Sequence, residues 1–86
     1  MATQIYNSAD DICRALHDAI AAALPDAQVR ANANSPGHFE LEVVSSAFAG
    51  KSMVQQQQLV YGAIRELMAG DGAPVHAIDR LRTKTP

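Results

Sequence analysis

The sequence predicts a small α+β domain with a three-stranded mixed sheet and both helices on one face. Eighty-six residues are enough for one domain only, residues 1–86. The hydrophobic pattern changes period along the chain in the order helix, strand, strand, helix, strand. A strand–helix–strand crossover makes the third strand parallel to one strand of the preceding hairpin. A mixed sheet follows from that order.

The first helix is predicted to begin after Ser8. Ser8 followed by Asp11 has capping-box spacing, with Asp in place of Glu. Apolar residues then recur every four positions, at Ile12, Leu16, Ile20 and Leu24. Pro25 ends the helix, because the residue before a proline avoids helical backbone angles. Residues 1–7 are expected to form a flexible N-terminus.

A β-hairpin is predicted to follow. Residues 27–33 alternate apolar and polar side chains, which is the period of a half-buried strand. Residues 34–37, Asn-Ser-Pro-Gly, are a dense turn signal. The second strand alternates again, with the apolar set Phe39, Leu41 and Val43. We expect one face of this antiparallel pair to lie against the first helix.

The second helix is predicted to start at the N-cap Ser52, after a loop with one short turn at residues 45–51. It is expected to run to about residue 68, with the four glutamines at 55–58 on its solvated side. Its predicted inner stripe is Met53, Val60, Ile64, Leu67 and Met68. Two glycines and a proline in residues 69–74 then stop it.

The third strand is predicted over residues 75–83. Ala77 and Ile78 are adjacent apolar residues, so the alternation is uneven there. We therefore expect a β-bulge near Asp79.

Composition excludes several classes of protein. Seven basic and nine acidic residues give a net charge of −2, so a broadly basic nucleic-acid binder is excluded. The single cysteine, Cys13, excludes an internal disulfide and favours a reducing, cytoplasmic setting. No signal-peptide pattern and no apolar run near the ~20 residues of a membrane span occur, so no membrane contact is expected.

No residue pattern assembles a nucleophile, a base and an oxyanion site, so an enzyme is not expected. Cys13 is interpreted as a small packed thiol beside Ile12. His17 and Asp18 are interpreted as part of the solvated side of the first helix.

Two histidines are candidate metal ligands. His38 opens the second strand and His76 the third, so parallel pairing of these strands would bring both to one edge of the sheet. Two ligands cannot close a tetrahedral site, and a metal would need further donors, most naturally from a partner protein. No tightly bound metal is therefore expected in the isolated chain. The alternative is two solvated histidines at strand ends.

A second candidate site is a local cluster of positive charge. Gly50 and Lys51 precede a helix N-terminus, where free backbone amides attract anions. The third strand carries the basic patch, which consists of Arg80, Arg82 and Lys84. Asp79 alone is expected to oppose that patch. These residues are the candidate contacts for a nucleic acid, with weak, salt-sensitive binding.

The order of residues resembles the BolA-like protein family. The central signature of that family is similar to His38-Phe39, Val43-Val44-Ser45, Phe48, Gly50-Lys51-Ser52, Val54-Gln55 and Leu59-Val60-Tyr61. Its C-terminal signature is similar to Val75-His76-Ala77-Ile78 followed by Thr83-Lys84-Thr85-Pro86. The resemblance covers the chain from the first helix onward, and the glutamine run is more similar to the IbaG branch than to BolA itself.

The resemblance implies a fold like a type II KH domain and a non-enzymatic role. Family members partner monothiol glutaredoxins of the CGFS type and share a [2Fe-2S] cluster with them. The partner supplies its cysteine and bound glutathione, and the BolA-like chain supplies the histidine of its C-terminal signature, here His76. A second ligand, His or Cys, usually comes from the loop between the first two strands.

The sequence departs from the family pattern at two places near these ligands. The loop at residues 34–37 holds no His or Cys, so His38 at its end is the nearest candidate for the second ligand. The segment from Asp79 to Leu81 is one residue longer than the pattern, which agrees with a bulge.

We expect an adaptor in iron–sulfur cluster trafficking or iron homeostasis, which alone is a monomer or a weak homodimer. The alternative is a KH-like transcriptional regulator that binds DNA weakly.

Overall fold

The computed structural model describes Tyr6 and residues 8–86. In chain order the elements are α1 (Ala9–Ala23), β1 (Gln28–Ser35), β2 (His38–Val44), the 3-10 helix η1 (Ser46–Phe48), α2 (Met53–Ala63), α3 (Arg65–Met68) and β3 (Ala77–Lys84). The expected flexible N-terminus, residues 1–7, lies outside the described residues except for the partly buried Tyr6. No helix within the described residues has the length and apolar character needed to cross a membrane.

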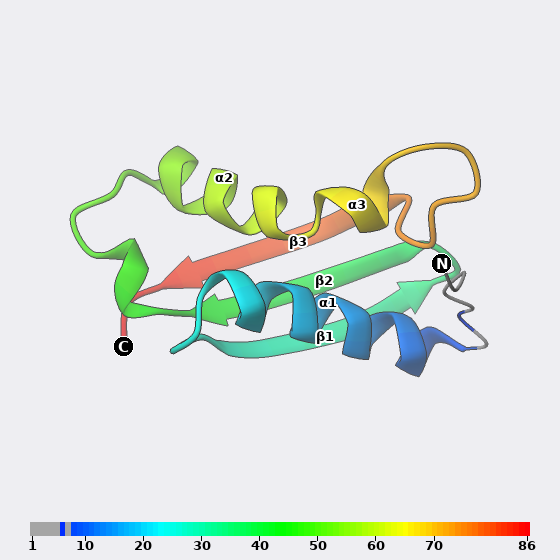
Figure 1. Ribbon diagram of the computed structural model, residues 1–86, viewed down its shortest axis with the longest axis horizontal. Coiled ribbons are helices and arrows are strands. Elements are labelled where there is room, and N and C mark those ends of the chain that lie inside the picture. Colours follow the sequence, from blue (N-terminus) through cyan, green and yellow to red (C-terminus); the bar gives the residue numbers. More distant parts are fainter. Residues whose placement is uncertain (1–5, 7) are drawn as a thin grey trace.

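The three strands form one mixed sheet in the order β1-β2-β3. β1 pairs with β2 antiparallel, and β2 pairs with β3 parallel. The helices lie on one face, with α1 over β1 and β2 and with α2 along β3 (Figure 1). The predicted fold class is confirmed. We call the opposite face, which carries none of the described helices, the open face.

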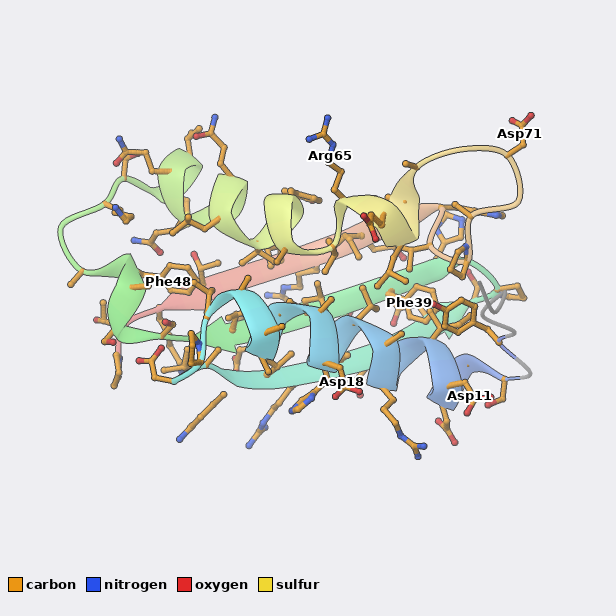
Figure 2. All side chains as sticks on the ribbon, viewed as in Figure 1. Asp11, Asp18, Phe39, Phe48, Arg65 and Asp71 are labelled. Carbon is orange, nitrogen blue, oxygen red and sulfur yellow. The ribbon has the colours of Figure 1, made fainter. Side chains whose placement is uncertain are left out.

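The core lies between the helices and the sheet. Every second residue of β2 points into it, because successive side chains of a strand alternate between faces. Phe39 and Phe48 are almost fully buried and lie toward opposite ends of the core (Figure 2). The buried hydrophobic residues are Leu16, Ile20, Leu24, Phe39, Leu41, Val43, Phe48, Val60, Ile64 and Val75.

The predicted caps of both long helices are confirmed. The Ser8 hydroxyl accepts a hydrogen bond from the Asp11 amide at 3.2 Å at the start of α1, and α1 ends before Pro25. Ser52 caps α2 through a full capping box. The Gln55 amide donates to the Ser52 hydroxyl, and the Ser52 amide donates to the Gln55 side chain.

The second helix differs from the prediction in two ways. It is interrupted at Ile64, whose φ of −105° and ψ of 12° separate α2 from α3 while its side chain is fully buried. Met53 was expected in the core but is 55% exposed. Gln56 is partly buried, and its side chain accepts a 2.7 Å hydrogen bond from the buried Thr83 hydroxyl, which also lies 3.5 Å from the Met53 sulfur. The glutamine run is therefore not wholly a solvated surface.

The edge of the sheet where β2 begins contains two β-bulges. In β3, Ile78 and Arg80 pair with successive β2 residues, so Asp79 is the extra residue, as predicted. A similar shift in β1 leaves Asn34 as an extra residue within the strand, although it was expected in the turn. Only Pro36-Gly37 separates β1 from β2, and Gly37 has a φ of +78°.

Asp26 joins the end of α1 to the connection after β2. Its carboxylate accepts hydrogen bonds from the Ser45 hydroxyl at 2.7 Å, the Ser46 amide at 2.8 Å and the Ser46 hydroxyl. The Ser46 and Ser45 side chains lower the pKa of Asp26 to about 2, with the Ser46 amide adding to them. These bonds hold η1 against the first helix–strand connection.

The Asp26 contact predicts a loss of stability in acid. An aspartate in an unfolded chain has a pKa of about 3.9, so the stabilisation by Asp26 is complete above pH ~4 and is lost as the pH falls toward ~2. Urea unfolding at pH 7, 4, 3 and 2.5 measures this slope. Asp26→Asn should reduce the pH dependence of the unfolding free energy. Asp71→Asn, in the exposed loop before β3, should leave that pH dependence unchanged. Equal slopes for all three chains would contradict the assignment.

Candidate functional site

The two candidate histidines lie at one edge of the sheet, as predicted. β2 and β3 are parallel neighbours that both begin there, and His38 is paired in register with Ala77, the residue after His76. Adjacent strands are about 4.8 Å apart, so the backbones carrying the two imidazoles are direct neighbours.

Gly37 fixes the backbone and the ring of His76. The carbonyl oxygen of Gly37 accepts hydrogen bonds from the His76 amide at 2.8 Å and the Ala77 amide at 3.1 Å. A Cβ atom on Gly37 would lie 2.6 Å from Nδ1 of His76, so the imidazole packs directly over the glycine. The His76 residue is exposed, and its ring makes no hydrogen bond to any part of the chain that the structure describes.

The two bulges bring four polar side chains together on the open face. This bulge cluster consists of Asn34, His38, Glu40 and Asp79, drawn from all three strands. Nδ1 of His38 lies 3.0 Å from Oδ1 of Asp79. The Asn34 amide donates to Oδ2 of Asp79 at 3.1 Å and to Oε2 of Glu40 at 3.3 Å.

The electrostatics of the bulge cluster define the proton position on His38. The hydrogen bond from His38 and then that from Asn34 lower the pKa of the Asp79 carboxyl. Asp79 is therefore ionised at neutral pH, and an ionised carboxylate only accepts hydrogen bonds. Nδ1 of His38 consequently donates its hydrogen to Oδ1 of Asp79, and Nε2 is the ring nitrogen that this contact leaves unused.

These side chains do not form a complete metal site. Among Tyr6 and residues 8–86, no three His, Cys, Asp or Glu side chains are arranged to hold a metal ion together. The donor chemistry nevertheless fits a site completed by another protein, because the two imidazoles begin neighbouring strands. Nitrogen ligands of this kind replace cysteine at one iron of Rieske [2Fe-2S] centres.

Three titratable residues of α1 have structural explanations. Cys13 packs against the core, and burial, with the Asp10 carboxylate, raises the pKa of its thiol. A neutral, partly buried thiol is unreactive, which agrees with the predicted packed role. His17 and Asp18 are exposed and contact each other at 3.1 Å, as expected for a solvated helix side.

The candidate nucleic-acid residues do not form one separate positive surface. The basic side chains of β3 lie on the open face, where Arg80 pairs with Glu40 and Arg82 pairs with Glu42. The expectation that Asp79 alone opposes them is therefore wrong, because the register of the central strand places its glutamates beside the arginines.

Lys84 and the Gly50-Lys51 loop lie toward the opposite end of the sheet from the histidines. The Lys84 carbonyl accepts a 3.0 Å hydrogen bond from the Ser45 amide, where β2 has ended and η1 begins. Gly50 and Lys51 follow η1 in the connection to α2 (Figure 1). Lys84 and this loop are thus distant from the histidines, whereas Arg80 lies beside Glu40 of the bulge cluster.

Sequence reasoning missed the contacts that join the bulge cluster. Asp79 was predicted as a bulge, but not as the partner of His38, 41 residues earlier. Asn34 and Glu40 carried no signal beyond their places in a turn and a strand. The extra residue near position 79 was the one feature that could have pointed to them.

Comparison with known proteins identifies the family. The family model described as BolA-like protein matches residues 13–86. Mouse BolA-like protein 1 is 46% identical over 54 residues, which cover 63% of this chain and 36% of that protein. The solution structure of mouse BolA1 superposes with a TM-score of 0.71 at 30% identity, covering 100% of this chain and 74% of the mouse chain.

The chain belongs to the BolA-like protein family. An Arabidopsis SufE-like protein 1, chloroplastic/mitochondrial, is 41% identical over 63 residues, covering 70% of this chain and 16% of the plant protein. The matched segment spans about a third of the mouse relative's length and less of the plant one. Membership of the IbaG branch and the likeness to a KH domain stay predictions.

The contact between Gly37 and His76 predicts that Gly37→Ala lowers the free energy of unfolding more than a matched glycine-to-alanine substitution elsewhere. Gly72→Ala is the control, because Gly72 has a similar φ of +74° but no atoms within 4 Å of the position that an added methyl group would take. Each alanine costs about 1–2 kcal/mol for its left-handed backbone. Gly37→Ala must in addition displace the His76 ring.

Urea unfolding and the NMR resonances of the His76 ring measure the two effects. We expect Gly37→Ala to lower the unfolding free energy more than Gly72→Ala and to shift the His76 ring resonances. Equal losses with unchanged His76 resonances would show that the ring does not rest on Gly37.

Proposed function

We propose that this chain is a non-enzymatic adaptor that shares a [2Fe-2S] cluster with a monothiol glutaredoxin, in iron–sulfur cluster trafficking or iron homeostasis. His76 is the proposed ligand. The observation that carries the proposal is the His76 ring, exposed and without a hydrogen-bond partner in the described chain, yet held over Gly37. A ring held in this way keeps a nitrogen available to a partner.

The incomplete ligand set supports a shared cluster over a resident metal. Two imidazoles begin neighbouring strands, and the described residues offer no third ligand beside them. A partner that supplies a cysteine and glutathione sulfur would complete the set. When bound, the cluster would supply iron that accepts imidazole nitrogen in place of sulfur.

The comparisons support a role alongside other proteins. A BolA domain is part of SufE1 from Arabidopsis, and that domain has the same fold as this chain, with a TM-score of 0.72. A BolA domain that is covalently joined to a second protein in one organism supports a role for this chain beside a separate partner protein. A cytoplasmic location, expected from the single cysteine, stays a prediction.

His76→Ala is expected to prevent a stable mixed cluster while leaving the fold intact, because the residue is exposed and contributes little to the core. The heterodimer is reconstituted with a monothiol glutaredoxin, glutathione, iron and sulfide, and the cluster is followed by visible circular dichroism. His17→Ala is the control, since His17 is an exposed histidine on α1.

His38→Ala is expected to weaken or retune the cluster without eliminating it, because His76, the partner cysteine and glutathione remain. An unchanged cluster spectrum for His76→Ala would overturn the proposed function.

A further inference from the structure

We infer that Asp79 is a positioning residue that holds His38 as an Nε2 ligand for the shared cluster. This inference rests on the proposed function and names the second ligand of the same site. It starts from two irregularities of the sheet, the bulge at Asp79 and the bulge at Asn34, which lie on either side of the first residues of β2.

The bulge at Asp79 determines where its side chain lies. Ile78 points to the core and pairs with Phe39, whereas Arg80 lies on the open face and pairs with Glu40. At this extra residue the Asp79 carboxylate reaches β2 and lies 3.0 Å from Nδ1 of His38. The extra residue lets Asp79 contact His38 while Arg80 keeps its place beside Glu40 and Leu81 returns to the core.

The carboxylate is itself supported by Asn34. Asn34, extruded by the bulge in β1, donates its amide to the other oxygen of Asp79 and to Glu40. Each Asp79 oxygen therefore has its own donor, one from His38 of β2 and one from Asn34 of β1. Side chains held in this way orient a ligand with less loss of conformational entropy.

The contact with Asp79 sets the chemistry of the His38 ring. A histidine that donates one ring N–H to a carboxylate presents the other nitrogen to a metal, with its tautomer and orientation set. His38 and Asp79 are 44% and 39% exposed, so a partner can reach the ring. The hairpin turn holds no His or Cys, and the oriented His38 at its end supplies the imidazole that the turn lacks.

The tautomer of His38 tests the positioning without any cluster. Long-range ¹H–¹⁵N NMR at neutral pH should show His38 predominantly protonated at Nδ1 in the full chain. Asp79→Ala should shift it toward the Nε2-protonated form. Glu40→Ala is the matched control, because Glu40 belongs to the bulge cluster but accepts its hydrogen bond from Asn34, while the hydrogen bond of His38 goes to Asp79. If His38 has the same tautomer in the unchanged chain and in Asp79→Ala, the inference is overturned.

The mixed cluster tests the ligand role. With a monothiol glutaredoxin and glutathione, Asp79→Ala should accelerate loss of the visible circular dichroism bands by about 10-fold or more, the usual effect of removing such a carboxylate. In a chain that already carries His38→Ala, Asp79→Ala should not accelerate the loss of these bands further. Asp79→Asn keeps an acceptor oxygen, so it should lose the cluster more slowly than Asp79→Ala. This second variant tests the same contact in case the alanine variant does not fold.

The outcomes separate the two proposals. A wild-type chain that forms the mixed cluster, together with an Asp79→Ala variant that retains it equally well, would overturn this inference and leave the proposed function standing. A wild-type chain that forms no mixed cluster would overturn the proposed function, and the ligand role of His38 with it.

Discussion

The carbonyl oxygen of Gly37 accepts hydrogen bonds from two successive amides, those of His76 and Ala77, and the register of the third strand starts from these bonds. The same glycine lacks the methyl group that would collide with the His76 ring. A left-handed φ at this position closes the hairpin as well. One residue thus ends the β1–β2 turn, starts the β2–β3 pairing and supports the candidate ligand.

That arrangement explains why the functional candidates lie at one edge of a small sheet. The crossover through α2 and α3 makes β3 parallel to β2, so both strands begin at the same edge. The two bulges then place a carboxylate beside the His38 imidazole and an amide beside that carboxylate. The core, formed by the helices and the other face of the sheet, is left undisturbed, because the bulge cluster lies on the open face.

The open face also places acidic side chains beside its arginines. In one row across the sheet, Glu42 of β2 lies between Arg30 of β1 and Arg82 of β3. Opposite charges on neighbouring strands stabilise each other and reduce the positive potential that a phosphate backbone would require. The net charge of −2 has the same effect on the whole chain.

The parts of the structure that depend on local patterns were predictable from sequence. Ser8 and Ser52 were recognised as caps because capping depends on residues three positions apart. The bulge at Asp79 was predicted from a fault in the strand alternation. Gln56 is partly buried and accepts a hydrogen bond from Thr83, 27 residues away, which no local pattern encodes. The contact between His38 and Asp79 was missed for the same reason.

The most direct test of the central claim is pulsed electron paramagnetic resonance of the reduced mixed cluster. This chain is labelled with ¹⁵N-histidine, and the monothiol glutaredoxin and glutathione are left unlabelled. The account predicts strong ¹⁵N hyperfine couplings from two directly bound imidazoles, with one set removed by His38→Ala, the variant that is expected to keep the cluster. A reduced cluster with no ¹⁵N coupling from this chain would contradict the claim that its histidines bind the iron.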